Sequence, residues 1–131
     1  MANKIKSWDE LKTLRTKAQT EVMGKESDWV VAVGVATCGA AAGGDKVMEV
    51  IHETIAKEGL SNVKVVSTGC FGNCYAEPVV EVRKASVPAG SGTRYGYVDE
   101  ARAKEIVEKH LKHGEVIAEA IVGQNQEVYI P

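Results

Sequence analysis

The stretch TGCFGNCYAEP, residues 68–78, places Cys70 and Cys74 in a glycine-containing loop that ends on a proline. On its amino-terminal side, NVKVVST (residues 62–68) alternates weakly between apolar and polar side chains. On its carboxyl-terminal side, PVVEVRK (residues 78–84) is rich in β-branched side chains and begins at a proline, where a missing N–H is tolerated. Both flanks predict β-strands, so the two cysteines lie on a loop between strands.

A strand, a loop of small residues and a helix are predicted upstream of this stretch. WVVAVGV (residues 29–35) is a short apolar run that predicts a central strand. ATCGAAAGGD (residues 36–45) predicts a loop that carries Cys38, and Asp45 at its end predicts the N-cap of the next helix. A right-handed crossover through that helix makes the strand at 62–68 parallel to the first one.

The loops that follow these two parallel strands are predicted to meet. Parallel strands point the same way, so Cys38 on one loop and Cys70 and Cys74 on the other emerge at one edge of the sheet. Small residues flank all three sulfurs, which lets the backbone approach an inorganic cluster and turn its N–H groups toward it. The three thiols therefore predict an iron–sulfur or metal site.

An amphipathic helix is predicted at the start of the chain. Ser7 and Glu10 have the spacing of a capping box, and apolar residues then recur at helical spacing until the helix stops near Gly24. Trp8 on this helix and Trp29 at the start of the first strand are predicted core anchors.

A hairpin and a helix are predicted after the cysteine loop. The hairpin turns at residues 86–92, and its return strand is predicted to place Tyr95 and Tyr97 on one face. Asp99 predicts the N-cap of a helix that Gly114 ends, so the elements follow the order α, β, α, β, β, β, α.

The tail is harder to assign. Residues 115–122 fit either a helical turn or a strand, and residues 124–131 predict an extended arm.

The composition is that of an ordinary globular protein with a single core. Hydrophobic residues make up 44% of the 131 residues and the formal net charge is −2, so the chain has no basic surface for nucleic acid. No apolar run approaches the roughly 18 residues that span a bilayer, and residues 1–22 are too polar for a secretory signal. We therefore expect a cytoplasmic protein that binds neither nucleic acid nor membranes. In that compartment, three cysteines favour metal binding or redox chemistry over a disulfide framework.

Three segments carry a family resemblance: GVATCGAAAGG (residues 34–44), TGCFGNCYAEPVVEV (residues 68–82) and YGYVDEARAKEIVEKHLKHG (residues 95–114). Together they resemble the thioredoxin-like [2Fe-2S] ferredoxin family. That family includes the small subunit of respiratory-type NADH dehydrogenase and accessory ferredoxin domains or subunits of NAD-linked iron-only hydrogenases. The most specific part is the spacing of Cys70 and Cys74 ahead of a glutamate, a proline and a strand.

The resemblance implies an α/β fold, a thioredoxin-like mixed sheet of about four strands flanked by helices. It divides the chain into an N-terminal helix (residues 1–25), a ferredoxin domain (residues 26–114) and a C-terminal tail (residues 115–131). It also implies a cis peptide bond between Glu77 and Pro78.

In function, the resemblance implies a non-catalytic electron carrier that holds one [2Fe-2S] cluster on Cys38, Cys70 and Cys74. The implied partners are flavin- or NADH-binding subunits or a hydrogenase subunit of a redox complex, and a homodimer is also compatible with it.

The chain departs from the family pattern on its first loop. Cys38 is the one cysteine there, whereas many members carry two, about four residues apart. A [2Fe-2S] cluster normally takes four protein ligands, so one ligand is unassigned. The positions where another cysteine is expected hold Ala32, Gly34, Ala41 and Gly43. The fourth ligand could come from a partner chain or from the side chain of Thr37, Asp45 or His52. Alternatively, the chain is a cluster-free structural or regulatory subunit of a redox complex.

Two further interpretations of the thiols stay open. Cys38, Cys70, Cys74 and a histidine would suit a structural zinc ion by the softness of the ligands. Cys70 and Cys74 would alternatively suit a thiol oxidoreductase, although such enzymes commonly use C-x-x-C at a helix N-terminus. His110 and His113 are interpreted as last-turn histidines that suit a helix dipole, rather than as metal ligands.

Overall fold

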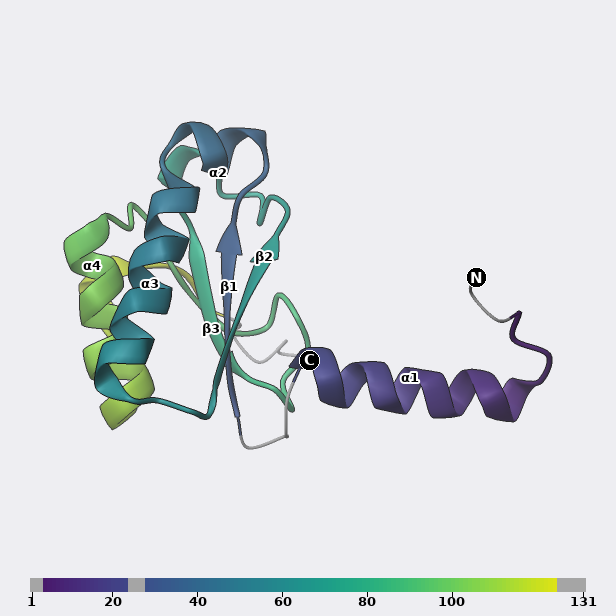
Figure 1. Cartoon of the computed structure of the whole chain (residues 1–131). Helices are drawn as coiled ribbons and strands as arrows, with labels where there is room; N and C mark the ends of the chain where they lie inside the picture. The colour runs from purple at the N-terminus through teal and green to yellow at the C-terminus, as the bar shows by residue number, and fades with distance from the viewer. Residues whose placement is uncertain (1–3, 24–27, 125–131) are drawn as a thin grey trace, which may run out of the picture.

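One mixed sheet organises the chain in the computed structural model, which describes residues 4–23 and 28–124 (Figure 1). Its strand order is β2–β1–β3–β4–β5. The strands are β1 Trp29–Gly34, β2 Val63–Thr68, β3 Val80–Lys84, β4 Thr93–Tyr95 and β5 Ile121–Gln124. β1 and β2 are parallel, as the sequence predicts, and the other neighbours are antiparallel. The resemblance implied about four strands, and the tail supplies the fifth.

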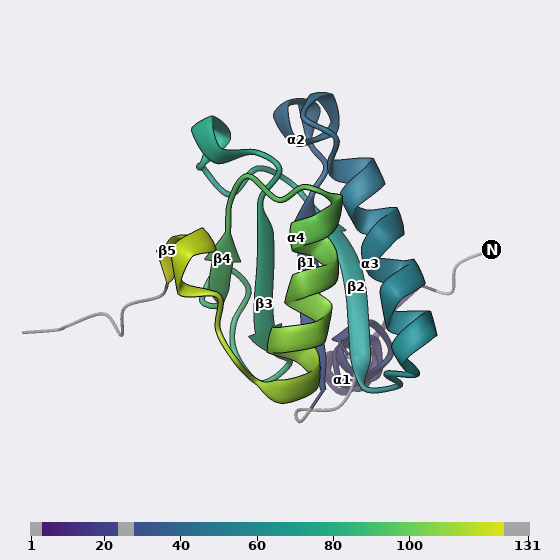
Figure 2. The same cartoon turned by 90° about the vertical axis from the view of Figure 1, so that its left-hand side faces the viewer.

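The core lies between one face of this sheet and two helices. α3 (Gly44–Glu58) and α4 (Glu100–Glu105) lie on the same face of the sheet, as Figures 1 and 2 show from two directions. α4 continues into the π-helical segment η2 (Ile106–Leu111). Alternate residues of the central strands point toward these helices, and they pack with apolar residues of the helices and of the segment after η2. The buried cluster includes Val31, Val33, Val47, Ile51, Val80, Val82, Tyr95, Ile106, Val107 and Ile117.

The segment between β1 and α3 differs from the predicted loop. A short helix, α2 (Thr37–Ala41), stands there, and the N-cap of α3 is Gly43 with φ +97°, so the prediction of Asp45 as the cap is wrong. Close packing onto the end of β1 explains the small residues. A Cβ at Gly39 would lie 2.1 Å from the backbone oxygen of Gly34, and one at Gly44 would lie 2.6 Å from it.

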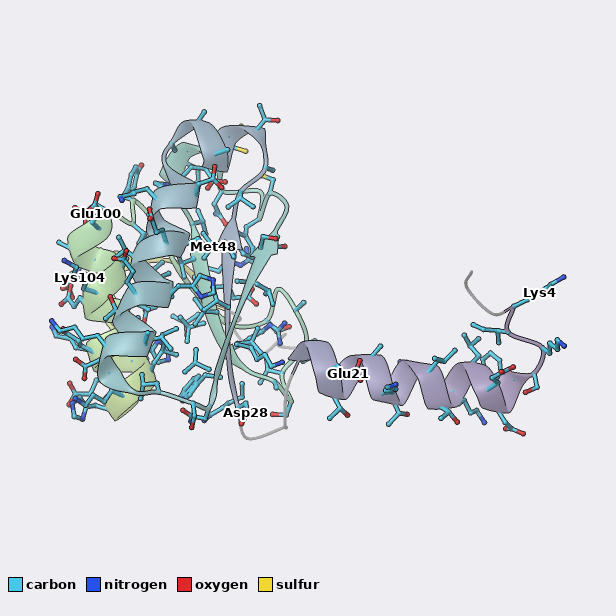
Figure 3. All side chains as sticks on the ribbon, in the orientation of Figure 1. Lys4, Glu21, Asp28, Met48, Glu100 and Lys104 are labelled. Carbon is cyan, nitrogen blue, oxygen red and sulfur yellow. The ribbon has the colours of Figure 1, made fainter. Side chains whose placement is uncertain are left out.

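α1 (Trp8–Met23) extends away from the sheet (Figures 1 and 2). Figure 3 shows its side chains extending on several sides of the ribbon, with Lys4 at the far end. The predicted cap is present, since the backbone N–H of Glu10 donates to Ser7 Oγ at 3.2 Å. However, Trp8 is 67% exposed, so its prediction as a core anchor is wrong. At the other end of the helix, Lys64 Nζ donates to the backbone oxygen of Glu21 at 2.6 Å.

The carboxyl-terminal part of the described chain closes the core. The predicted N-cap is confirmed, because Asp99 Oδ1 accepts a hydrogen bond from the N–H of Arg102 at 2.7 Å. Tyr95 is buried, whereas Tyr97 is exposed and has φ +50°, so the prediction that both share one face is wrong. The reason is that β4 ends at Tyr95. His110, interpreted from the sequence as a residue that suits the helix dipole, is buried, and its Nδ1 forms a hydrogen bond with Tyr95 Oη.

The tail contains both of the structures that the sequence allowed. A 3-10 turn, η3 (Ala118–Ala120), leads directly into β5, which pairs with β4. Residues 125–131, most of the predicted arm, lie outside the described residues. Within the part of the chain that the structure describes, no helix is long and apolar enough to cross a bilayer.

Candidate metal centre

The two cysteine-bearing segments leave the sheet at the same edge. Gly34 and Thr68 are the last paired residues of β1 and β2, and the N–H of Val35 donates to the backbone oxygen of Thr68 at 3.1 Å. α2, which carries Cys38, follows β1, and the loop that carries Cys70 follows β2 (Figure 1). The parallel arrangement that the sequence predicts therefore brings both segments to this edge, at the carboxyl ends of the strands.

Cys70 and Cys74 form a close thiol pair. Their Sγ atoms are 3.2 Å apart, and the backbone N–H of Gly72 donates to Cys70 Sγ at 3.2 Å. Gly72 has φ +84°, a conformation that side-chain-bearing residues rarely adopt, so the glycine allows the tight turn that aims this N–H at the sulfur. Cys74 begins the single 3-10 turn η1 (Cys74–Ala76). Both thiols are free and exposed.

Cys38 contributes to a change in the pKa of Cys74. Hydrogen bonding and charge from Cys70 first, and then from Cys38, raise the pKa of Cys74 to about 11. The hydrogen bond with Cys70 favours the protonated thiol of Cys74, and repulsion between like charges further disfavours its thiolate. Cys38 thus influences Cys74 across the edge that both segments share, although the two segments are far apart in the sequence. The structure therefore brings together the three cysteines that the sequence singled out.

Cys70 and Cys74 are in contact with each other, but the three thiols do not surround a common point as the ligands of one metal ion would. Among residues 4–23 and 28–124, no three His, Cys, Asp or Glu side chains are arranged to hold a single metal ion. Thr37 adjoins Cys38 on α2, while Asp45 and His52 are exposed on α3. Gly43, where a second cysteine of the first loop is expected, has open space around the position of a Cβ but a φ of +97°.

Glu77 lies between the two cysteine-bearing segments. Its Oε2 accepts a hydrogen bond from the N–H of Val79 at 3.0 Å. The same oxygen would lie 3.3 Å from a Cβ at Gly39 and 3.5 Å from one at Gly34. The Glu77–Pro78 peptide bond is cis, as the resemblance implied. The sequence indicated Glu77 only as part of the cysteine motif. It did not indicate that the Glu77 side chain lies next to Gly39 of α2, because strand and loop patterns do not predict contacts between separate loops.

A cavity of about 480 Å³ lies on the sheet face away from α3 and α4 and reaches Cys70. Its floor contains Glu81 and Arg83 of β3, whose Oε1 and Nε are 3.1 Å apart and whose side chains are buried. Arg94 of β4 and Phe71 of the cysteine loop complete the wall nearest the thiols. The sequence predicted β3 and β4 as strands but gave no signal for this buried charged cluster.

Comparisons with known proteins relate the chain to redox proteins. No protein-family model matches it. It is 35% identical over 123 residues to the NADP-reducing hydrogenase subunit HndB of Solidesulfovibrio fructosivorans, which covers 94% of each chain. It is 37% identical over 73 residues to a 2Fe-2S ferredoxin of Clostridium pasteurianum, covering 55% of this chain and 66% of the relative.

Solved structures agree with these sequence relatives. The chain superposes on the thioredoxin-like [2Fe-2S] ferredoxin of Aquifex aeolicus with a TM-score of 0.64 and 28% identity. The match covers 75% of this chain and 99% of the ferredoxin. The expected thioredoxin-like fold is thereby confirmed.

Proposed function

Because this chain belongs to the thioredoxin-like [2Fe-2S] ferredoxin family, we propose that Cys38, Cys70 and Cys74 hold one [2Fe-2S] cluster that carries electrons. The observation that carries the assignment of these residues is the meeting of three thiols from two segments at one edge of the sheet. A bound [2Fe-2S] cluster supplies one-electron transfer.

The protein's own residues would serve the site in three ways. The thiols of Cys70 and Cys74 are already paired, so little rearrangement is needed for both to act as ligands. The N–H of Gly72 points at Cys70 Sγ and would lower the cost of negative charge there. The raised pKa of Cys74 means that its proton must be displaced when metal binds, so loading releases protons and is favoured by higher pH.

The fourth ligand lies outside the three thiols. Within the chain the candidates are Thr37, Asp45 and His52, all of which are exposed, and the other source is a partner subunit. A three-cysteine site at an exposed edge suits a carrier that is completed or covered when its complex assembles.

We infer that the chain works as a subunit of a hydrogenase-type redox complex rather than as an enzyme by itself. The relative HndB is a subunit of an NADP-reducing hydrogenase, and 94% of this chain aligns with it. Electrons would pass between the cluster and a flavin- or NADH-binding subunit or a hydrogenase subunit. We expect this complex to be cytoplasmic, and a homodimer of the chain is a further arrangement that the same surface would allow.

The test is reconstitution of the anaerobically purified full chain with iron and sulfide. We expect visible charge-transfer absorption with about two irons and two acid-labile sulfides per chain. Cys74→Ser should lower the absorption strongly without unfolding the sheet. Ser86→Ala, an exposed residue on the hairpin loop, is the matched control and should behave like the unmodified chain.

Three results would contradict the proposal. A colourless chain without metal would favour a cluster-free structural or regulatory subunit. One zinc ion per chain and no visible absorption would favour the structural zinc site. Unchanged absorption in Cys74→Ser would remove Cys74 from the ligand set.

A further inference from the structure

We propose that Arg94 is a positioning residue that ties the Cys70–Cys74 loop to a fixed carboxylate in the sheet and so holds the thiol pair in place before a cluster is loaded. The inference rests on the proposed function of the thiols. It concerns a residue outside the cysteine motif, on strand β4.

Arg94 contacts the cysteine loop on both sides of Gly72. Its Nη1 donates to Asn73 Oδ1 at 3.3 Å, and its guanidinium lies over the Phe71 ring, 5.7 Å from the ring centroid. Phe71 and Asn73 both lie between the two cysteines. One planar guanidinium therefore holds the loop by a hydrogen bond and by a cation–π contact.

The other side of Arg94 is anchored to the sheet. Arg94 is paired with Glu81 in the β3–β4 register, and its Nε lies 3.8 Å from Glu81 Oε2. Its Nη2 also donates to the backbone oxygen of Gly90 at 2.8 Å. The anchor and the loop contacts use different nitrogens of the same fork, which a lysine ammonium does not reproduce.

Glu81 is a fixed anchor point. Its side chain is 1% exposed, its Oε1 lies 3.1 Å from Arg83 Nε, and that oxygen also accepts a hydrogen bond from the N–H of Gly90 at 3.1 Å. Within the described residues, Glu81 Oε2 has no hydrogen-bond partner, so Arg94 provides its neighbouring positive charge. A buried carboxylate needs such compensation, and this need keeps the guanidinium beside it.

The first experiment measures alkylation of the three thiols in the full, metal-free chain under reducing conditions, by mass spectrometry of the cysteine peptides. Glutathione alkylated in the same sample serves as the reference thiol, because Cys38 interacts with Cys74 and is not independent of the pair. Arg94→Gln is compared with Arg102→Gln. Arg102 is the matched control, since its side chain is 29% exposed against 26% for Arg94 and it is likewise paired with carboxylates, those of Glu105 and Glu119.

We expect Arg94→Gln to raise the ratio of the alkylation rates of Cys70 and Cys74 to that of glutathione about five-fold, the effect of losing one modest hydrogen-bonding anchor. Arg102→Gln should leave the ratio unchanged. Arg94→Lys should behave like Arg94→Gln, because it keeps the charge but loses the fork. A lysine variant that restores the ratio would show that charge alone acts, which would overturn the positioning role.

Asn73→Ala keeps the pair of Arg94 and Glu81 and the contact with the Phe71 ring, and it removes only the hydrogen bond to the loop. It therefore decides the inference even if Arg94→Gln fails to fold. It should raise the same ratio, and combining it with Arg94→Gln should add little, because both changes break one link. Ratios in Asn73→Ala equal to those of Arg102→Gln would overturn the inference.

A second readout uses the loaded chain. Removing the positive charge of Arg94 should lower the reduction potential, since the reduced state carries more negative charge, whereas Arg102→Gln should not. Failure of the unmodified chain to take up a cluster would refute the proposed function, while the alkylation ratios would still decide the role of Arg94. A chain that loads normally but shows equal ratios in Arg94→Gln and Arg102→Gln would refute this inference alone.

Discussion

Gly39 shows how a single residue sets the distance between the two cysteine-bearing segments. A Cβ at this position would lie 2.1 Å from the backbone oxygen of Gly34 and 3.3 Å from Glu77 Oε2. Gly39 is itself buried, so a side chain at this position would have to displace its neighbours. The absence of a side chain therefore allows α2, with Cys38, to lie directly on the end of β1.

We predict that Gly39→Ala lowers the free energy of unfolding by about 2 kcal/mol, the usual cost of overpacking. Gly69→Ala is the control, because a Cβ there has no neighbour within 4 Å. Denaturant titration of the metal-free chains measures both values. Equal stabilities of the two variants would show that α2 can lift from β1 at little cost.

His110 predicts how stability changes with pH. Tyr95 Oη accepts a hydrogen bond from the N–H of Ile117 at 3.3 Å and forms a second, buried hydrogen bond with His110 Nδ1 at 2.7 Å. Burial first, and then the charge of Lys84, lowers the pKa of His110. The unfolded chain therefore takes up this proton at a higher pH than the folded chain does.

It follows that the contribution of His110 is fully present above its unfolded pKa of about 6.5 and is lost as the pH falls from there through the folded value. We expect the free energy of unfolding to decrease between pH 7.5 and pH 5. Denaturant titrations at several pH values should show a weaker decrease in His110→Gln. The same slope in both proteins would assign the effect to other groups.

At the scale of elements, the two tryptophans illustrate how a helix can be well formed and yet contribute little to the core. Trp8 on α1 is 67% exposed. Trp29 on β1 packs against the core, contacts the His110 ring edge-on at 5.2 Å, and is covered by Lys84 Nζ, 3.8 Å from a ring centroid. Both residues look alike in the sequence, since each begins an apolar pattern.

We predict that Trp8→Ala changes the free energy of unfolding by no more than about 0.5 kcal/mol, as surface substitutions usually do. Trp29→Ala should lower it by about 3 kcal/mol, because it removes a large packed ring. Thermal unfolding followed by circular dichroism compares them. A large loss in Trp8→Ala would mean that α1 packs against the body more extensively than its exposure indicates.

α2 offers a way to supply the fourth ligand within the chain. Cys38 and Ala41 lie three residues apart in this helix, so they share a face. If the proposed cluster is present, Ala41→Cys should slow the loss of its visible absorption in air several-fold. Ala40→Cys is the control, because Ala40 is an exposed residue of α2 that lies two positions from Cys38 and therefore on another side of the helix, and it should have no such effect. Faster bleaching in Ala41→Cys would place the missing ligand elsewhere.

At the scale of the whole molecule, the sequence predicted the parts of the fold that depend on local pattern and on chain direction. β1, β2 and the helix between them follow from apolar runs and the handedness of crossovers, and these place Cys38 beside Cys70 and Cys74. The cis bond at Pro78 followed from the family resemblance.

The remaining features depend on contacts between distant segments. α2 was missed because its run of small residues has no apolar periodicity, and β5 was left open because its pairing with β4 decides it. Strand alternation indicates that Glu81 and Arg94 share a face, but not that a guanidinium reaches Asn73. The sequence therefore located the thiols and missed the residues that support them.

The short distance between the sulfurs of Cys70 and Cys74 also has a consequence for storage of the metal-free protein. Because the Sγ atoms of Cys70 and Cys74 are exposed and 3.2 Å apart, we expect dissolved oxidants to couple them in a metal-free preparation. The sheet and its buried apolar residues are untouched by that reaction, so a stored sample would keep its spectrum of secondary structure while losing its ability to take up iron. The content of free thiols, rather than the secondary structure, is therefore the property to measure before iron is added.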